Sequence, residues 1–507
     1  MNNWRKFPHK IWVVICLLSG IALIPAVSGC EKGGSAPINL VMQVIGDLTP
    51  LPDKVEEEFQ KFVDAFKQKT PRDESVEEQI KYFRFAFKRI RTSYVRQIKD
   101  STLINAAIKG LQEADTKPNS NPSMLVDSAI EGMTKSLDPH STFLNAREFR
   151  ETFIHTKGEF GGLGIEVTMQ DGFVKVVAPI EDTPAARGNM MSGDLIVAVD
   201  GVSIKGLTLA AAVRLMRGPP GEAIELLVRR KDRQDFMVKI IRAIIKVRAV
   251  RWNPIGNIAY IRVSRFSEKV KSGIVKAFAD IRQQLGEEPK GVVLDLRNNP
   301  GGLLEQSVIL ADAFLDSGQI VSVRGRTSSQ QSSFKATDGD LAVGKRMVVL
   351  VNGGSASASE IVISALKYHK RATIMGSRTF GKGSVQTIIP MPGEGALRLT
   401  TALYYGADGH TIQARGVKPD ILIKSDVSGK KSNPRESDLP GAIPKELLSQ
   451  VINNAPRVLM EKCPKTYAPR RVGRKEVVDE ILGCALKFLE AGSKEKFLAV
   501  YGPNSKI

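Results

Sequence analysis

The stretch GSRTFGKGS, residues 376–384, places a lysine between two glycines directly after an apolar segment, RATIM. The first glycine and the pair Gly-Lys382 match the spacing G-x-x-x-x-G-K of a phosphate-binding loop. Such a loop also needs a serine or threonine after the lysine, and then a helix whose N–H groups meet the phosphate. Here Gly383 follows the lysine, and the next residues, SVQTII before Pro390, predict a strand. The sequence therefore argues against a nucleotide site.

A lysine between glycines can instead serve as a general base. Small neighbours let backbone and apolar side chains approach the amine, and desolvation lowers the pKa of a buried lysine. Such a base needs a nucleophile, and the segment GGSASASE at 353–360 offers one at a predicted strand-to-helix turn. The Ser357 hydroxyl would lie beside free helix N–H groups there. Ser357 and Glu360 also form a capping box, so an ordinary helix N-cap fits equally well.

Histidine and metal chemistry are less favoured. His369 lies at the far end of the predicted helix, roughly 18 Å from Ser357 along the axis at 1.5 Å per residue. The serine also lacks a G-x-S-x-G context. The histidines at 140, 155 and 410 show no spacing typical of a metal site. We therefore expect no metal and no other cofactor.

The first thirty residues predict export. Basic residues precede an apolar run at 11–27, which leads into VSGC with Cys30 last. This order is typical of a secretory signal peptide, residues 1–29. The cysteine after Ser-Gly resembles the lipobox of bacterial lipoproteins, while an uncleaved anchor or ordinary cleavage are the alternatives. We expect a periplasmic or cell-envelope protein, anchored to a bacterial membrane by a lipid on Cys30.

The composition is that of a globular protein with a basic surplus. Hydrophobic residues make up 42% and charged residues 25% of 507 positions, and the formal net charge is +19. Residues 1–29 hold three basic and no acidic residues, so the mature chain keeps +16, which suits anionic envelope surfaces. No basic helix or aromatic-interleaved basic stripe indicates a nucleic-acid partner. An oxidising compartment would allow Cys463 and Cys484 to pair, without requiring it.

Changes in periodicity divide the mature chain into four stretches. Helical spacing of apolar residues gives way to short strands with glycine turns, and then to alternating strands and helices, the pattern of an α/β layer. A Ser/Lys/Gly/Pro-rich linker and an amphipathic helix end the chain. The expected stretches are a helical region at 30–155, a β-rich module with helices at 156–242, an α/β core at 243–424, and a linker with a helical extension at 425–507.

Six motifs together resemble the carboxyl-terminal processing, or tail-specific, serine proteases. Each motif alone is weak, but their succession over about residues 50–425 is specific. The resemblance implies an α/β multidomain fold: a helical N-terminal region, a PDZ module, a protease core of the ClpP/crotonase-like type and a helical C-terminal tail. The motifs are LDPHSTF at 137–143, GGLGI at 161–165, DLRNNPGG at 295–302, SASASE at 355–360, FGKGSVQ at 380–386 and GVKPD at 416–420.

The resemblance implies cleavage by a serine–lysine dyad through an acyl-enzyme. Ser357 would be the nucleophile and Lys382 its general base. Gln386 would lie on the same strand face as Lys382 and orient its amine. The oxyanion would be held by backbone N–H groups, those of Ala358 and of one glycine in the PGG motif. Gly301 is favoured there, and its neighbour stays the alternative.

The β-rich module resembles a PDZ domain. The resemblance implies that its glycine loop captures the free carboxylate of a protein C-terminal tail, which adds as a strand beside residues 165–168. Apolar side chains would form the pocket for the last residue, although packing in the core explains them as well. The residues expected to bind the tail are Gly162, Leu163, Gly164, Ile165, Val213 and Met216.

A function from another class stays open: a lipid-tethered PDZ adaptor that binds tails and does not cleave them. An adaptor would not require Ser357, Lys382 and Gln386 together, so the intact set favours the protease. The phenylalanines at 59, 62 and 66 share one predicted helix face. They are either core residues or an arm for a homodimer, and the resemblance favours a homodimer.

Overall fold

The computed structural model describes most of the chain beyond residue 49. The chain divides after Leu51, and the elements below belong to Pro52–Ile507. The predicted signal peptide and Cys30 lie outside the described residues. Those residues are 50–70, 75–114, 121–180, 183–246, 248–286, 289–327, 330–393, 395–423, 434–444, 458–460, 463–467 and 478–501.

The N-terminal helices pack around a cluster of phenylalanines. Phe59, Phe62 and Phe66 of helix α2 are fully buried, and the rings of Phe62 and Phe83 stack with centroids 3.6 Å apart. Apolar residues three and four apart give these helices one buried face each. The three phenylalanines therefore belong to the core of this chain. The helices are α2 (Asp53–Lys69), α3 (Ser75–Ser93), α4 (Asp100–Glu113) and α5 (Pro122–Lys135), followed by α6 (Ala146–Lys157).

A β-rich module follows, with a six-stranded sheet in the order β3-β4-β5-β7-β8 and β6 paired to β5. Buried and less buried residues alternate along β4 and β7, because successive side chains point to opposite faces of a strand. A two-stranded ladder of β2 (Glu159–Gly162) and β9 (Ala243–Lys246) adjoins it in sequence. The other elements are β3 (Ile165–Gln170), β4 (Phe173–Pro179), α7 (Pro184–Arg187), β5 (Leu195–Val199), β6 (Val202–Ser203), α8 (Leu209–Met216), β7 (Ala223–Arg229) and β8 (Phe236–Ile241).

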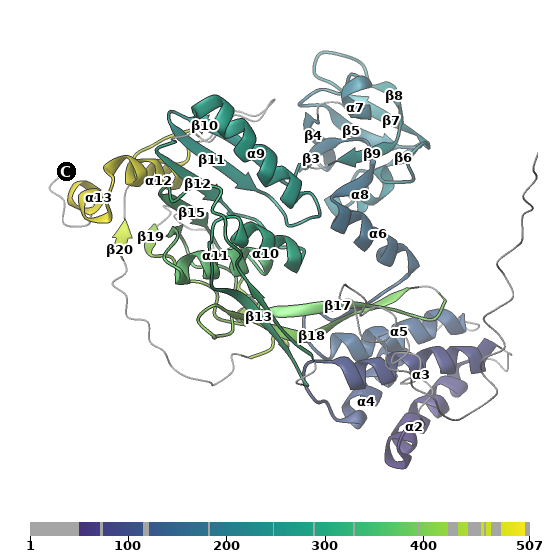
Figure 1. Cartoon of the computed structure of the whole chain (residues 1–507). Coiled ribbons are helices and arrows are strands. Elements are labelled where there is room, and N and C mark those ends of the chain that lie inside the picture. Colours follow the sequence, from purple (N-terminus) through teal and green to yellow (C-terminus); the bar gives the residue numbers. More distant parts are fainter. Residues whose placement is uncertain are drawn as a thin grey trace, which may run out of the picture. The chain divides into compact units, whose positions relative to one another are not determined.

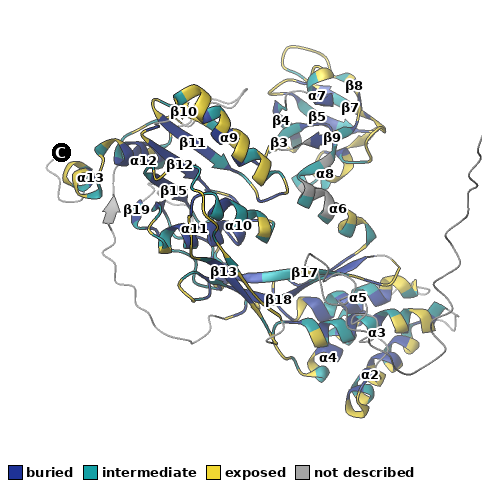
Figure 2. Cartoon of the chain, viewed as in Figure 1, coloured by how far each residue is buried: buried dark blue, intermediate teal, exposed yellow. Residues whose placement is uncertain are grey.

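The α/β core is built on a seven-stranded sheet in the order β10-β11-β12-β15-β16-β19-β20 (Figure 1). From β11 onward neighbouring strands are parallel, and β10 is antiparallel. Every residue of β12 and β15 is buried (Figure 2), as expected for parallel strands covered on both faces. The strands are β10 (Val250–Ile255), β11 (Ile258–Val263), β12 (Gly291–Asp295), β15 (Met347–Val351), β16 (Thr373–Gly376), β19 (Ile421–Ile423) and β20 (Val458–Met460).

Two groups of helices cover the two faces of this sheet. Alternate strand residues such as Val292 and Leu294 pack with α9 (Val270–Leu285), α10 (Leu304–Asp312) and α11 (Ala358–Tyr368). The residue between them, Val293, packs with Leu482 and Leu489 of the C-terminal helix α12 on the opposite face. The two C-terminal helices are α12 (Glu480–Ala491) and α13 (Lys494–Tyr501). The end of the chain thus completes the core.

A second sheet of five strands lies across the predicted domain boundary. Its longest strand, β18 (Ala396–Gly406), pairs with β1 (Thr142–Leu144), β13 (Gln319–Gly325) and β17 (Ser384–Pro390). Strand β14 (Gln331–Lys335) pairs with β13. The strand predicted after Lys382 is therefore present as β17. Residues 142–144, which the sequence assigned to the helical region, extend a sheet that strands of the α/β core form.

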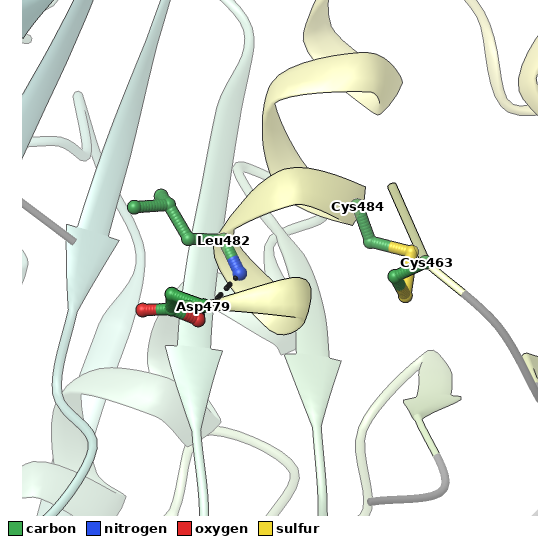
Figure 3. Close-up of a disulfide and its surroundings, with 4 residues drawn as sticks. All are labelled: Cys463, Asp479, Leu482 and Cys484. Atoms are coloured by element: carbon green, nitrogen blue, oxygen red, sulfur yellow. Dashed lines mark hydrogen bonds between the residues drawn. A yellow bond between two sulfur atoms is a disulfide. The ribbon is translucent and has the colours of Figure 1, made fainter. Parts of the chain in front are cut away.

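A disulfide and a capping hydrogen bond link helix α12 to the chain before it. Cys463 and Cys484 form a disulfide, which the sequence had left open, and the Asp479 carboxylate accepts the Leu482 N–H at 2.9 Å to cap α12 (Figure 3).

Among the described residues, no helix is long and apolar enough to cross a membrane.

Candidate active site

Ser357 lies at the turn between β15 and α11, and the serines on either side have other partners. The Ser355 hydroxyl donates to the carbonyl of Leu296 at 2.8 Å, and the Ser359 hydroxyl donates to the carbonyl of Asn299 at 2.9 Å. Both bonds hold the turn against the loop that follows β12. The middle serine is the N-cap of α11. Of the three serines, it is the one placed at the mouth of the helix.

The backbone of Ser357 is unusual for a residue with a side chain. Its φ is 56° and its ψ is −117°, whereas left-handed values of φ are common only for glycine, asparagine and aspartate. Such conformations cost on the order of 1–3 kcal/mol and persist where the surrounding structure enforces them, often at active sites. Neither neighbouring serine shares this positive φ. The strain therefore singles out the middle serine.

A buried carboxylate holds this turn to the loop that carries Lys382. Glu360 is fully buried and accepts the N–H groups of Ser357 at 2.9 Å, Gly381 at 2.7 Å and Lys382 at 2.9 Å. The Thr379 hydroxyl donates to it at 2.5 Å. The backbone nitrogens of Ser357 and Lys382 both donate to one oxygen of Glu360, Oε2. These two backbone nitrogens are therefore no farther apart than twice 2.9 Å. Glu360 thus brings the backbones of the predicted nucleophile and base together.

Burial affects the ionisation of both Glu360 and Lys382. Burial raises the pKa of the Glu360 carboxyl to about 7, against the opposing effect of its four hydrogen bonds. Burial also lowers the pKa of the Lys382 amine below its ordinary value. Both shifts favour the neutral form, as expected where water is excluded. For the lysine, this is the direction a general base requires.

Four charged side chains also act on the Lys382 amine. The Glu436, Asp138 and Glu360 carboxylates favour its charged form, with Glu436 the strongest of the four, and the Arg398 guanidinium opposes them. All three carboxylates are buried, none more than 3% exposed. The pKa of the amine is lowered in spite of these three negative charges, because burial has the largest effect.

Gln386 lies on β17 and contacts hydroxyl groups. Its amide donates to Ser384 Oγ at 2.9 Å and to Thr400 Oγ1 at 3.1 Å. Thr400 in turn donates to Asp138 at 3.1 Å. The register against β18 shifts between Val385 and Gln386, and such a bulge re-aims side chains. The hydrogen bonds of Gln386 therefore connect it to Asp138, one of the carboxylates that act on Lys382.

The glycine motif PGG lies against the Ser357 turn. A Cβ on Gly301, whose φ is 98°, would stand 2.8 Å from the Ala356 carbonyl and 3.0 Å from the Ala358 nitrogen, so only glycine fits there. The Gly301 N–H donates to Asn299 Oδ1 at 3.0 Å. Gly301 and Ala358 are thus close together, but Gly301 would have to exchange this hydrogen bond before it could hold an oxyanion.

The residues predicted to bind a tail gather in the β-rich module. Leu163 and Met216 are 3% and 5% exposed and belong to the core of the module, and Ile165 and Val213 pack against that core. Gly164 has a φ of 80°, and its carbonyl accepts the Thr183 hydroxyl at 3.0 Å. Gly162 ends β2. In this structure the apolar pair Leu163 and Met216 therefore has a packing role.

Three histidines have partners away from the Ser357 hydroxyl. His369 contacts the Gln319 carbonyl at 2.8 Å, His410 contacts the Asp408 carbonyl at 2.9 Å, and His140 contacts Glu436 at 2.8 Å. The side chain of His155 lies outside the described residues. Within the described part of the chain, no group of three or more His, Cys, Asp or Glu side chains is arranged to hold a metal ion.

Comparison with known proteins identifies the family. Over 346 residues the chain is 48% identical to the carboxy-terminal-processing protease of Bartonella bacilliformis, and the match covers 68% of this chain and 75% of that protein. The chain belongs to the carboxy-terminal processing serine proteases. The model of peptidase family S41 matches residues 257–423, and a PDZ domain model matches residues 175–230.

Two further relatives are less similar in sequence to this chain. The chain is 35% identical over 315 residues to the carboxy-terminal processing protease CtpA of Bacillus subtilis, which covers 61% of this chain and 66% of that protein. The solved photosystem II D1 C-terminal processing protease is 27% identical, over 68% of this chain and 92% of that chain, with a TM-score of 0.44. The predicted family and fold class, a PDZ domain with an S41 peptidase core after N-terminal helices, are confirmed.

Proposed function

We propose that this protein is an exported endopeptidase that binds protein C-terminal tails with its PDZ domain and cleaves peptide bonds through a Ser357–Lys382 dyad. One observation carries the proposal: a single buried oxygen of Glu360 accepts the N–H groups of both residues. The flanking serines are engaged in structural hydrogen bonds, and burial lowers the pKa of Lys382. Membership of a serine protease family agrees with this assignment.

The proposed chemistry requires a neutral Lys382 amine that reaches the Ser357 hydroxyl. Lys382 takes the Ser357 hydroxyl proton as the serine oxygen bonds to the peptide carbonyl carbon. The carbonyl oxygen becomes an oxyanion, held by N–H groups of Ala358 and a glycine of the PGG motif. The C–N bond then breaks, and the amine leaves with the proton from Lys382. Water attacks the acyl ester, releases the new carboxyl end and restores the Ser357 hydroxyl. Neither a metal nor a nucleotide is needed.

The PDZ domain supplies the choice of substrate. In this mode of recognition, backbone N–H groups of a loop take the terminal carboxylate, and the tail adds as a strand at the edge of the sheet. Residues 162–165 and helix α8 with Val213 and Met216 are the proposed binding surface. Because Leu163 and Met216 are nearly buried here, a tail would reach the pocket only after these side chains move.

Replacing Ser357 or Lys382 by alanine tests the dyad. We expect each variant to lose cleavage of a tail-tagged substrate by at least about a thousandfold, as nucleophile and base act as one unit. Binding of a fluorescent C-terminal peptide, followed by anisotropy, should stay at the wild-type level. Full activity of Lys382→Ala would exclude the dyad. A wild-type protein that binds the peptide and cleaves nothing would favour the adaptor function instead.

The cell-envelope location and the lipid anchor are proposed from residues 1–30. The variant Cys30→Ala, expressed in a bacterium fed a labelled fatty acid, should lose the label. Label that persists in the variant would contradict lipidation at this cysteine.

The proposed homodimer is tested on the soluble mature chain by sedimentation equilibrium, where a mass other than twice that of the chain would exclude it.

A further inference from the structure

Glu436 is a buried carboxylate from the segment after the core, outside the S41 match at 257–423. It begins the short 3-10 turn η2 (Glu436–Asp438) and is 1% exposed. Burying a carboxylate is costly unless hydrogen bonds or a charged partner compensate. The groups that Glu436 contacts therefore indicate what it holds in place.

The Glu436 carboxylate connects two distant parts of the chain to the loop of Lys382. Its Oε2 lies 2.8 Å from His140 Nε2, in the LDPHSTF motif, and its Oε1 accepts the Gln413 amide at 2.8 Å. Gln413, 1% exposed, accepts the Gly383 N–H at 2.9 Å. A Cβ on Gly383 would come within 2.3 Å of the Gln413 nitrogen. One side chain thus separates Glu436 from the residue after Lys382.

The same turn holds the residues before Lys382. The Glu436 N–H donates to the Phe380 carbonyl at 3.3 Å, and the Arg435 guanidinium donates to the Thr379 carbonyl. Contacts from the segment around Glu436 therefore lie on both sides of Lys382 along the chain. Thr379 and Gly381 of the same loop also donate to Glu360 of α11. Hydrogen bonds to two segments, that of Glu360 and that of Glu436, therefore hold the loop.

The charge of Glu436 also acts on the amine itself. Among the charged groups that face Lys382, namely Glu436, Arg398, Asp138 and Glu360, Glu436 has the largest effect and favours the protonated amine. Arg398 comes from β18, Asp138 from the turn before β1 and Glu360 from α11. The groups against Glu436 are the imidazole of His140 and the neutral amide of Gln413.

We propose that Glu436 is a positioning residue of the active site: through Gln413 it fixes the loop around Lys382, and it places a carboxylate against the segment that carries this loop. This inference rests on the proposed role of Lys382 as general base. It gives the segment after the core a part in catalysis, and it explains why His140 of the N-terminal region contacts a residue 296 positions away.

The variant Glu436→Gln tests the charge, since it keeps the size of the side chain. A carboxylate favours the protonated amine, so its loss lowers the pKa of Lys382. The rate of acetylation of Lys382 by acetic anhydride, followed by mass spectrometry from about pH 6 to 10, should reach half-maximum roughly one pH unit lower than in the wild type. Acetylation reports on the amine itself. The pH dependence of cleavage would also include the titration of Glu360, whose pKa is about 7. Glu480→Gln, which removes an exposed carboxylate from the same tail, should keep the wild-type midpoint.

Gln413→Ala tests the positioning, because it breaks the link to Gly383 and leaves the charge. Its kcat should fall about tenfold with KM little changed, since misplacement of a catalytic group is felt mainly in the transition state. A wild-type acetylation midpoint in Glu436→Gln together with a wild-type kcat in Gln413→Ala overturns the inference. If Glu436→Gln does not fold, as judged by circular dichroism, the kcat of Gln413→Ala decides.

The control for the proposed function is separate. If Lys382→Ala is inactive while the Glu436 and Gln413 variants behave as the wild type, the dyad stands and only the role of Glu436 fails. If Lys382→Ala retains cleavage, the assignment of the base fails, whatever the Glu436 variants show.

Discussion

At the scale of residues, the candidate site buries two ionisable groups, the amine of Lys382 and the carboxyl of Glu360, away from water. Burial favours the neutral form of the Lys382 amine and of the Glu360 carboxyl, and a base must be neutral to accept a proton. Glu360 has the opposite requirement. Its four donors are best matched by an ionised carboxylate, which only accepts hydrogen bonds. The proposed mechanism therefore requires each group to lose its proton, which happens at pH values above the pKa of that group.

This shared requirement predicts how activity depends on pH. As pH falls through about 7, Glu360 gains a proton and then carries an O–H where four donors converge. The amine of Lys382 becomes charged as pH falls through its own lowered pKa. We expect kcat/KM to fall toward acid pH, with a limb below the ordinary lysine value of 10.5 because burial lowers the pKa of Lys382. The measurement is kcat/KM on a peptide without ionisable side chains. A rate that increases toward acid pH would contradict it.

Glu360→Gln should damage both stability and activity. Glutamine keeps one acceptor oxygen, but its NH₂ group would face two of the four donors that now share the carboxylate. Each buried donor left unpaired costs about 1–3 kcal/mol, so we expect the free energy of unfolding to fall by about 2–5 kcal/mol, with kcat reduced at least about a hundredfold. Urea unfolding and kinetics measure these changes. Glu305→Gln, an exposed first-turn residue of α10, is the matched control and should change neither.

The sequence singled out Ser357 and Lys382 as candidates because both lie in local patterns, a strand-to-helix turn and a glycine-flanked lysine. It interpreted Glu360 only as a helix cap, since its other donors, such as Gly381, lie in a different segment of the chain. Asp138 was quoted within a motif without a role. Glu436 carried no signal, because the contact with His140 joins residues 296 apart and no local spacing reports such a contact.

At the scale of elements, α12 shows what amphipathicity does and does not specify. The sequence predicted a helix near its observed position from its apolar face. That pattern cannot say which surface the face covers, since any apolar surface would suit it. In the structure α12 packs on the sheet face opposite to α9 and α11. Arg297 makes paired hydrogen bonds to Asp479, before α12, and to Asp295 at the end of β12.

Asp479→Ala should therefore destabilise the core. It removes the cap of Leu482 and one of the two carboxylates that pair with Arg297, whose side chain is 13% exposed. A lost cap costs about 0.5–2 kcal/mol, and breaking a buried ion pair costs more unless another partner remains, as Asp295 does here. We expect a loss of about 2–4 kcal/mol in the free energy of unfolding, measured with urea. Glu480→Ala, the exposed neighbour, serves as the comparison, and an equal effect of the two variants would argue against the role of Arg297.

At the scale of the whole molecule, residues outside the segment that matches the S41 model, 257–423, complete the structure of that segment. Strand β1, from before the PDZ domain, pairs with β18, and Glu436, from after the core, contacts His140. Helix α12 covers one face of the central sheet. The parts of the chain that the sequence separated as a helical region, a core and a tail thus meet around one site, because strand pairing and burial join segments that composition had divided.

A chain ending at Pro444 tests whether the tail is part of the core. The truncation removes α12, with its buried side chains Leu482, Cys484, Leu486, Phe488 and Leu489. Each fully buried apolar side chain contributes about 1.5–3 kcal/mol, so together they reach on the order of 10 kcal/mol, close to the whole stability of a typical domain. We expect the truncated protein to be insoluble or inactive, although Ser357 and Lys382 are intact. A chain ending at Tyr501, which keeps both C-terminal helices, should be soluble and cleave at the wild-type rate. Solubility and cleavage are measured side by side, and an active chain ending at Pro444 would show that the tail only covers a core that is stable without it.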